Sequence, residues 1–157
     1  MPFQELTAQY GIYAVTFLVC LASGVVPVLN AEAYLIFASA VSPPAAILPL
    51  ILLATMGQMS AKAALYTTGL GVVKLPLRNH AERMERVRRK FERWKGRTNT
   101  FVFLSALTGF PPFYTVSMLA GAIRISFNRF MVFGFVGRFL RFAACVLGPQ
   151  IVAWWMK

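Results

Sequence analysis

Four long apolar stretches constrain what this chain can fold into. They cover residues 12–41, 44–73, 101–123 and 130–156 and hold very few charges. A helix that crosses a bilayer needs about 20 predominantly apolar residues. The chain is 58% hydrophobic and only 13% charged, against about 25% charged residues in soluble domains. These features predict an all-α integral membrane protein whose 157 residues form a single membrane domain.

Two of the four stretches are interrupted by residues that break helices. These are Pro27 in residues 12–41, and Gly109, Pro111 and Pro112 in residues 101–123. Proline lacks an N–H and clashes with the preceding turn. Backbone groups left unpaired at membrane depth are tolerated only inside protein or beside a water-filled cavity. We therefore expect two re-entrant hairpins, with proline-kinked spanning helices as the alternative. Residues 44–73 and 130–156 are predicted transmembrane helices.

The order hairpin, spanning helix, basic segment, hairpin, spanning helix predicts an inverted repeat. Val26 and Pro27 resemble the segment 110–112, and Gly57-Gln58 resembles Gly137-Arg138. Paired interrupted segments at corresponding positions of two halves are the best sequence indication of a transporter site.

The positive charge is concentrated between the two halves. Ten Lys and Arg and three Glu lie between Lys74 and Arg97, out of a net charge of +11 for the chain. This segment should be cytoplasmic, and a re-entrant second hairpin places Arg124 and Arg129 on the same side. An apolar stripe with a basic opposite face predicts an amphipathic helix within residues 74–98 that binds the anionic inner leaflet through residues 77–97. Packing on the protein itself is the alternative, and His80 on the stripe is expected to be a packing residue.

The composition argues against several functional classes. The chain has no Asp and a single His, which excludes Asp-based metal sites, Ser-His-Asp triads and aspartate-rich phosphotransferases. We expect no enzymatic activity, no cofactor and no metal. Cys20 and Cys145 lie in apolar runs and are expected to be buried free thiols. Because the positive charge is confined to one segment, nucleic acid is not an expected partner.

Four charges fall inside the apolar stretches: Glu32, Lys62, Arg138 and Arg141. Each costs roughly 3 kcal/mol at a helix centre. Arg138 and Arg141 are three residues apart and therefore share one helix face, near mid-membrane. Structural alternatives remain open, because Lys62 can extend toward the membrane surface and Glu32 can serve only as a salt-bridge partner.

Three cations against one carboxylate suggest an anionic ligand. Buried unpaired charge is costly, and arginine pairs suit phosphate oxygens. Glu32 can partly neutralise the cations or carry a proton. We therefore predict a binding site for an anionic head group, plausibly a phosphate. Its substrate-binding set is Glu32, Arg138, Arg141, Lys62, Asn30 and Tyr114.

The chain resembles the DedA/VTT family, also called the SNARE-associated Golgi protein family, in its Tvp38-like and YqaA-like branch. The residues that carry the resemblance are Gly57, Tyr66, Gly69 and Gly71, the run 111–114 with Ser117, Ala120, Gly121, Arg124 and Phe130, and Gly137, Arg138 and Arg141. Pro27 and Glu32 resemble the proline and the acid of the family's first hairpin. The sequence departs from the family at Gln58, where an acid often follows the glycine. It also lacks the arginines that flank the second hairpin proline, a charge that we expect Arg138 and Arg141 to replace.

The resemblance implies two re-entrant hairpins and movement of lipid between leaflets. It suggests a phospholipid or a polyprenyl-phosphate lipid as the partner. The predicted protein is a multi-pass flippase or scramblase of the cell inner membrane, with proton coupling and homo-oligomers left open. A small-anion transporter and a non-transporting scaffold are the alternatives.

Overall fold

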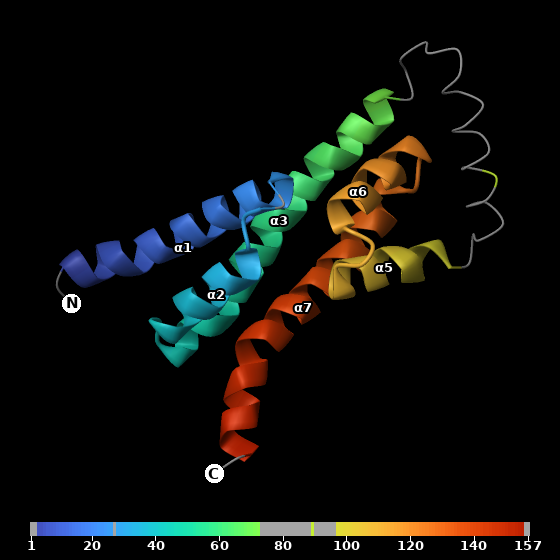
Figure 1. Cartoon of the computed structure of the whole chain (residues 1–157). Coiled ribbons are helices and arrows are strands. Elements are labelled where there is room, and N and C mark those ends of the chain that lie inside the picture. The colour runs from blue at the N-terminus through green and yellow to red at the C-terminus, as the bar shows by residue number, and fades with distance from the viewer. Residues whose placement is uncertain (1–2, 27, 73–88, 90–96, 156–157) are drawn as a thin grey trace. The chain divides into compact units, whose positions relative to one another are not determined.

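In the computed structural model the described residues are 3–26, 28–72, 89 and 97–155. They are helical throughout apart from short connections, which confirms the predicted all-α class for these residues. The helices are α1 (Phe3–Val25), α2 (Ala31–Ala40), α3 (Pro44–Val72), α5 (Thr98–Thr108), α6 (Phe113–Ala122) and α7 (Phe127–Trp155) (Figure 1). Most of the predicted amphipathic helix at residues 74–98, including His80, lies outside the described residues.

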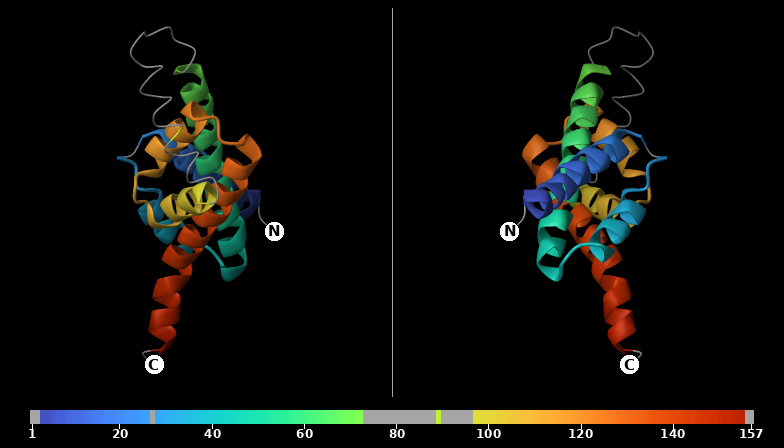
Figure 2. Two further views of the ribbon diagram at one scale, coloured as in Figure 1. Left: turned by 90° about the vertical axis from the view of Figure 1, so that its right-hand side faces the viewer. Right: turned by 90° about the vertical axis from the view of Figure 1, so that its left-hand side faces the viewer.

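Both interrupted stretches form two helices separated by a break. The two helices of each pair, α1 with α2 and α5 with α6, contact each other and run in different directions from the break (Figures 1 and 2). Helix α1 begins at Phe3, so it extends well before the apolar stretch predicted to start at residue 12. Each half of the chain therefore has the same order of elements, a helical hairpin followed by a long helix of 29 residues.

The two long helices are the candidates for crossing a membrane. Segments Pro44–Gly71 and Phe127–Pro149 have mean hydropathies of 1.5 and 1.8 and are long and apolar enough to span one. Each contains a proline inside the helix, Pro49 and Pro149. In length and composition, both segments are consistent with the transmembrane helices predicted at residues 44–73 and 130–156.

The chain divides into two compact units. The first consists of residues 1–61 and 138–157, and the second of residues 62–137. Each unit thus contains one hairpin, the first part of the long helix that follows it, and the last part of the other long helix.

Apolar side chains fill the interior of each unit. The core of the first unit is formed by Cys20, Ala31, Leu35, Ala46, Leu50, Ile51, Ala54, Phe142 and Val146. In the second unit the Phe130 ring stacks on Tyr66 at 5.3 Å and on Phe113 at 5.9 Å between centroids. The Tyr66 hydroxyl donates to the carbonyl oxygen of Ile125 and so satisfies its polar end inside this cluster.

Two glycines allow a long helix to touch a hairpin helix backbone to backbone. A Cβ built on Gly57 would lie 2.5 Å from the Phe17 carbonyl oxygen of α1, and one built on Gly137 would lie 2.7 Å from the Phe103 carbonyl oxygen of α5. Small residues at such crossings let membrane helices approach closely. Gly57 and Gly137, matched between the halves on sequence, therefore make the same kind of contact in their separate units.

Gly57→Ala and Gly137→Ala are each expected to lower stability by about 1–3 kcal/mol, because the added methyl forces two backbones apart. The matched controls are Gly71→Ala and Gly148→Ala, where a Cβ meets nothing within 4 Å. The controls should be neutral or stabilising by up to about 1 kcal/mol, since alanine is the better helix former. Thermal unfolding in detergent measures all four, and equal effects at the crowded and open glycines would contradict the packing described here.

Candidate functional site

Glu32 is held in place by the start of α2. Asn30 is the N-cap of this helix, and its side-chain oxygen accepts a hydrogen bond from the Ala33 N–H at 3.1 Å. Asparagine is among the preferred residues at this position because it satisfies an otherwise unpaired helix N–H. Glu32 then falls in the first turn, where the positive end of the helix dipole stabilises a carboxylate. Asn30, predicted to bind substrate, thus has a structural role in positioning Glu32.

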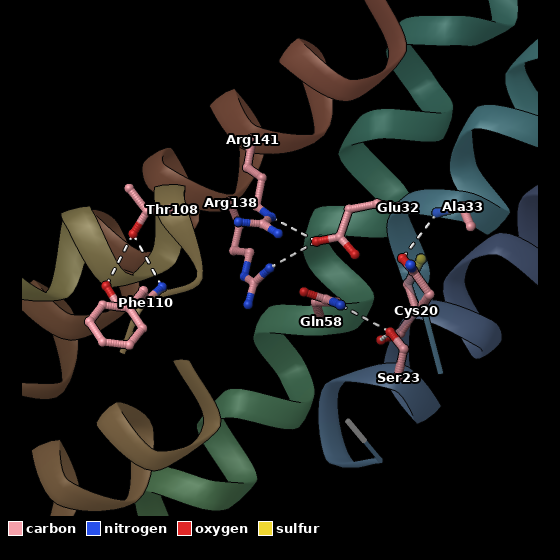
Figure 3. A network of polar contacts seen from close by, with 10 residues as sticks. Cys20, Ser23, Glu32, Ala33, Gln58, Thr108, Phe110, Arg138 and Arg141 are labelled. Atoms are coloured by element: carbon pink, nitrogen blue, oxygen red, sulfur yellow. Dashed lines mark hydrogen bonds and ion pairs between the residues drawn. The ribbon is translucent and has the colours of Figure 1, made fainter. Parts of the chain in front are cut away.

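One oxygen of Glu32 joins both arginines of α7. The Arg141 Nε donates to Glu32 Oε1 at 2.7 Å, and an Arg138 guanidinium nitrogen lies 3.5 Å from the same oxygen (Figure 3). All three residues belong to the first unit. The structure thus brings together three of the four charges that the sequence places inside the apolar stretches.

The three side chains differ in their access to solvent or lipid. The Arg138 side chain is only 10% exposed, whereas those of Arg141 and Glu32 are 27% and 23% exposed. A ligand can therefore reach the cluster at Arg141 and Glu32, with Arg138 behind them. If all three groups are ionised, the cluster carries one net positive charge.

A second polar group lies beside this cluster in the first unit. Gln58 of α3 donates from Nε2 to the Ser23 Oγ at 2.9 Å, and Ser23 donates to the Cys20 carbonyl oxygen at 2.9 Å. Figure 3 shows the amide of Gln58 between Ser23 and Arg138. Gln58 was noted in the sequence only as the residue after Gly57. Nothing in the sequence indicated that Ser23 would contact Gln58, because a serine in an apolar helix ordinarily hydrogen-bonds the backbone of its own helix.

Lys62 and Tyr114 belong to the second unit. Lys62 is buried, with Nζ 6.0 Å from the centroid of the Phe113 ring, which is at the limit of a cation–π contact. Tyr114 is 40% exposed on α6. Of the four charges in the apolar stretches, the first unit therefore holds two arginines and one carboxylate, and Lys62 belongs to the second unit.

The residues at the break between α5 and α6 have clear backbone roles. Gly109 ends α5 in the left-handed conformation with φ 80°, which glycine adopts without a Cβ penalty. Pro111 follows a cis peptide bond, and its carbonyl oxygen accepts from the Ser105 Oγ at 2.7 Å. Pro112 is the N-cap of α6. Pro27, the corresponding candidate in the first hairpin, lies outside the described residues.

The family model of the VTT domain matches residues 26–150. The chain belongs to the VTT domain family. The match includes both breaks, all of α3, most of α7 and the Glu32, Arg138 and Arg141 cluster, and it confirms the resemblance to the DedA/VTT family. Together with the two long apolar helices, membership of this family indicates a membrane protein. No curated protein and no solved structure is similar enough to the chain to count as a match.

Glu32→Gln and Arg141→Gln, each alone, are expected to destabilise this VTT protein by about 1–3 kcal/mol, because each removes the charge-assisted hydrogen bond between these two partly buried side chains. The loss of stability in the double variant should be smaller than the sum of the losses in the two single variants, with a coupling energy of about 1–3 kcal/mol. Arg129→Gln, an exposed position on the same helix, serves as the control and should have little effect. Strict additivity in thermal unfolding would show that the pair is not coupled.

Proposed function

We propose that this protein moves a phosphate-bearing lipid between the two leaflets of a membrane. The observation that carries the proposal is a single carboxylate oxygen held between two arginines inside an apolar helical unit. This arrangement marks a point in the protein where an anionic oxygen is stable.

The arginine pair suits a phosphate better than it suits Glu32 alone. Two guanidinium groups offer ten N–H donors, whereas one carboxylate has about four acceptor positions. Phosphate oxygens match the planar guanidinium in two-point contacts. In the structure a Glu32 oxygen lies between the two arginines. A phosphate that binds here would compete with Glu32 for Arg141. The exchange couples ligand binding to α2, since Glu32 belongs to that helix. Glu32 is also the candidate to carry a proton if transport is proton-coupled.

The surface of α2 favours a lipid over a small anion. Ile36 and Phe37, one turn beyond Glu32 on the same helix, are 42% and 67% exposed. Exposed apolar side chains beside a polar site suit acyl chains next to a head group. The runner-up functions are small-anion transport and a scaffold without transport.

The proposal includes a multi-pass protein of the inner membrane with an inverted repeat of re-entrant hairpins. The apolar residues at both breaks support it, since Val28 is 87% exposed between α1 and α2 and Phe110 is 82% exposed between α5 and α6. Side chains of this kind are stable in hydrocarbon and unfavourable in water. Hairpin tips inside the bilayer would explain why Val28 and Phe110 are both exposed.

Lipid movement should depend on the arginine pair. In vesicles that contain the purified protein, the Arg138→Gln, Arg141→Gln double variant should lose nearly all leaflet exchange of a labelled phospholipid, because the phosphate loses its cationic partners. Arg141→Lys should retain only part of the activity, since lysine cannot form the two-point contact. Arg129→Gln is the control for charge on α7.

A wild-type rate from a folded double variant would refute the phosphate site and leave the arginines structural. Exchange of phosphate or sulfate without lipid exchange would favour the small-anion transporter. A wild-type protein that moves neither would favour the scaffold.

Re-entrance of the second hairpin predicts that Arg97 and Arg124 face the same compartment. In a chain without Cys20 and Cys145, single cysteines at positions 97 and 124 should both react with a membrane-impermeant thiol reagent from the cytoplasmic side only. Reaction of position 124 from the opposite side would mean that α5 and α6 together cross the membrane.

A further inference from the structure

The amide of Gln58 has a fixed orientation in the first unit. Ser23 Oγ donates its only hydrogen to the Cys20 carbonyl oxygen, so the hydroxyl can act only as an acceptor toward Gln58. The nitrogen of the Gln58 amide must therefore face Ser23, at the observed distance of 2.9 Å. Gln58 is only 5% exposed, which leaves its oxygen buried at the opposite end of the amide.

Among the described residues, this buried oxygen lacks a hydrogen-bond donor, and the arginines of the phosphate site do not supply one. Gln58 Oε1 accepts no hydrogen bond from any residue that the structure describes. Figure 3 shows that it points away from Ser23, toward the side of the Arg138 guanidinium and Glu32. Buried amide oxygens are nearly always paired, and an unpaired one weakens the fold. An acceptor kept in this position next to a candidate ligand site calls for a donor from the ligand.

We propose that Gln58 is a second anchor of the phosphate site and accepts a hydrogen bond from a donor group on the lipid head group. The inference rests on the proposed function, which supplies the arginine anchor for the phosphate. The ligand is then a phosphate that carries a hydrogen-bond donor close to it. An ammonium or hydroxyl group beside a phosphodiester meets this requirement, and so does the P–OH of a singly protonated phosphate monoester. A trimethylammonium group does not, because it has no N–H.

Donor-free head groups should bind about tenfold more weakly than donor-bearing ones. Sites built to hydrogen-bond a ligand N–H or O–H discriminate strongly against analogues that lack it, because the buried protein group is then left unpaired. The discrimination should depend on Gln58 and on no other buried polar residue of α3.

The test uses the full chain in detergent and four short-chain lipids in two matched pairs. Dihexanoyl phosphatidylethanolamine and phosphatidylcholine differ at the head-group nitrogen, where three N-methyl groups of phosphatidylcholine replace the N–H donors. Dihexanoyl phosphatidic acid and phosphatidylmethanol differ in the P–OH, which the acid retains at pH about 5, below its second pKa of about 6. Apparent affinities come from the rise of the unfolding temperature with ligand concentration. The pair that shows the tenfold difference identifies the source of the donor.

Three variants assign the discrimination to the amide. Gln58→Met keeps the length of the side chain without its polar atoms and should reduce the difference within each pair to less than about twofold. Ser23→Ala releases the Gln58 amide from its anchor and should give an intermediate ratio, which keeps the test decisive if Gln58→Met does not fold. Thr55→Val is the control, since Thr55 is also fully buried on α3 and its hydroxyl bonds only the Ile51 carbonyl of its own helix. It should retain the discrimination of the wild type.

Equal binding of all four lipids by the wild-type protein would overturn the inference about Gln58, with a bound water then satisfying its oxygen, while leaving the phosphate site intact. Discrimination that persists in Gln58→Met would also overturn it and point to head-group size. Absence of binding by all four lipids would refute the phosphate site itself.

Discussion

The charge cluster of Glu32, Arg138 and Arg141 is the constraint around which the first unit is organised. Ionised groups in an apolar surrounding are stable only when they neutralise one another. Glu32 contacts both arginines through one oxygen and offsets one of their two charges, and the contact ties α2 to α7. The same contact keeps the anionic position occupied by a group of the protein. Under the proposed function, a phosphate would take the place of Glu32 at Arg141, so binding would release the contact between α2 and α7.

Local devices hold these charges at the required positions. The Asn30 cap fixes where α2 begins and so the face on which Glu32 lies. The spacing of Arg138 and Arg141 places both on one face of α7. Gly57 lets α3 approach α1 closely, and the neighbouring Gln58 reaches Ser23 of that helix. The polar residues of the first unit are thus positioned by short-range rules of helix capping and helix packing.

Sequence reasoning succeeded where the physical cause is local. Proline and glycine chemistry predicted the break between α5 and α6. The scarcity of charges in an apolar chain identified Glu32, Arg138 and Arg141 as candidates, and the structure places these three side chains together. Sequence reasoning did not predict the hydrogen bond between Gln58 and Ser23. Serine in an apolar helix usually hydrogen-bonds the backbone of its own helix, as Ser39 does. The early start of α1 was also missed, since polar residues near Phe3 interrupt the hydropathy pattern without preventing a helix.

The apolar tips of the hairpins also bear on how such a protein enters a membrane. A segment that must be carried across hydrocarbon is costly when its leading loop is polar, because every donor and acceptor has to lose its water. The breaks between the hairpin helices instead expose Val28 and Phe110. Transfer of such apolar side chains from water into hydrocarbon is favourable. Under the proposed re-entrant arrangement, each helical hairpin would enter the bilayer from one face with this apolar tip first.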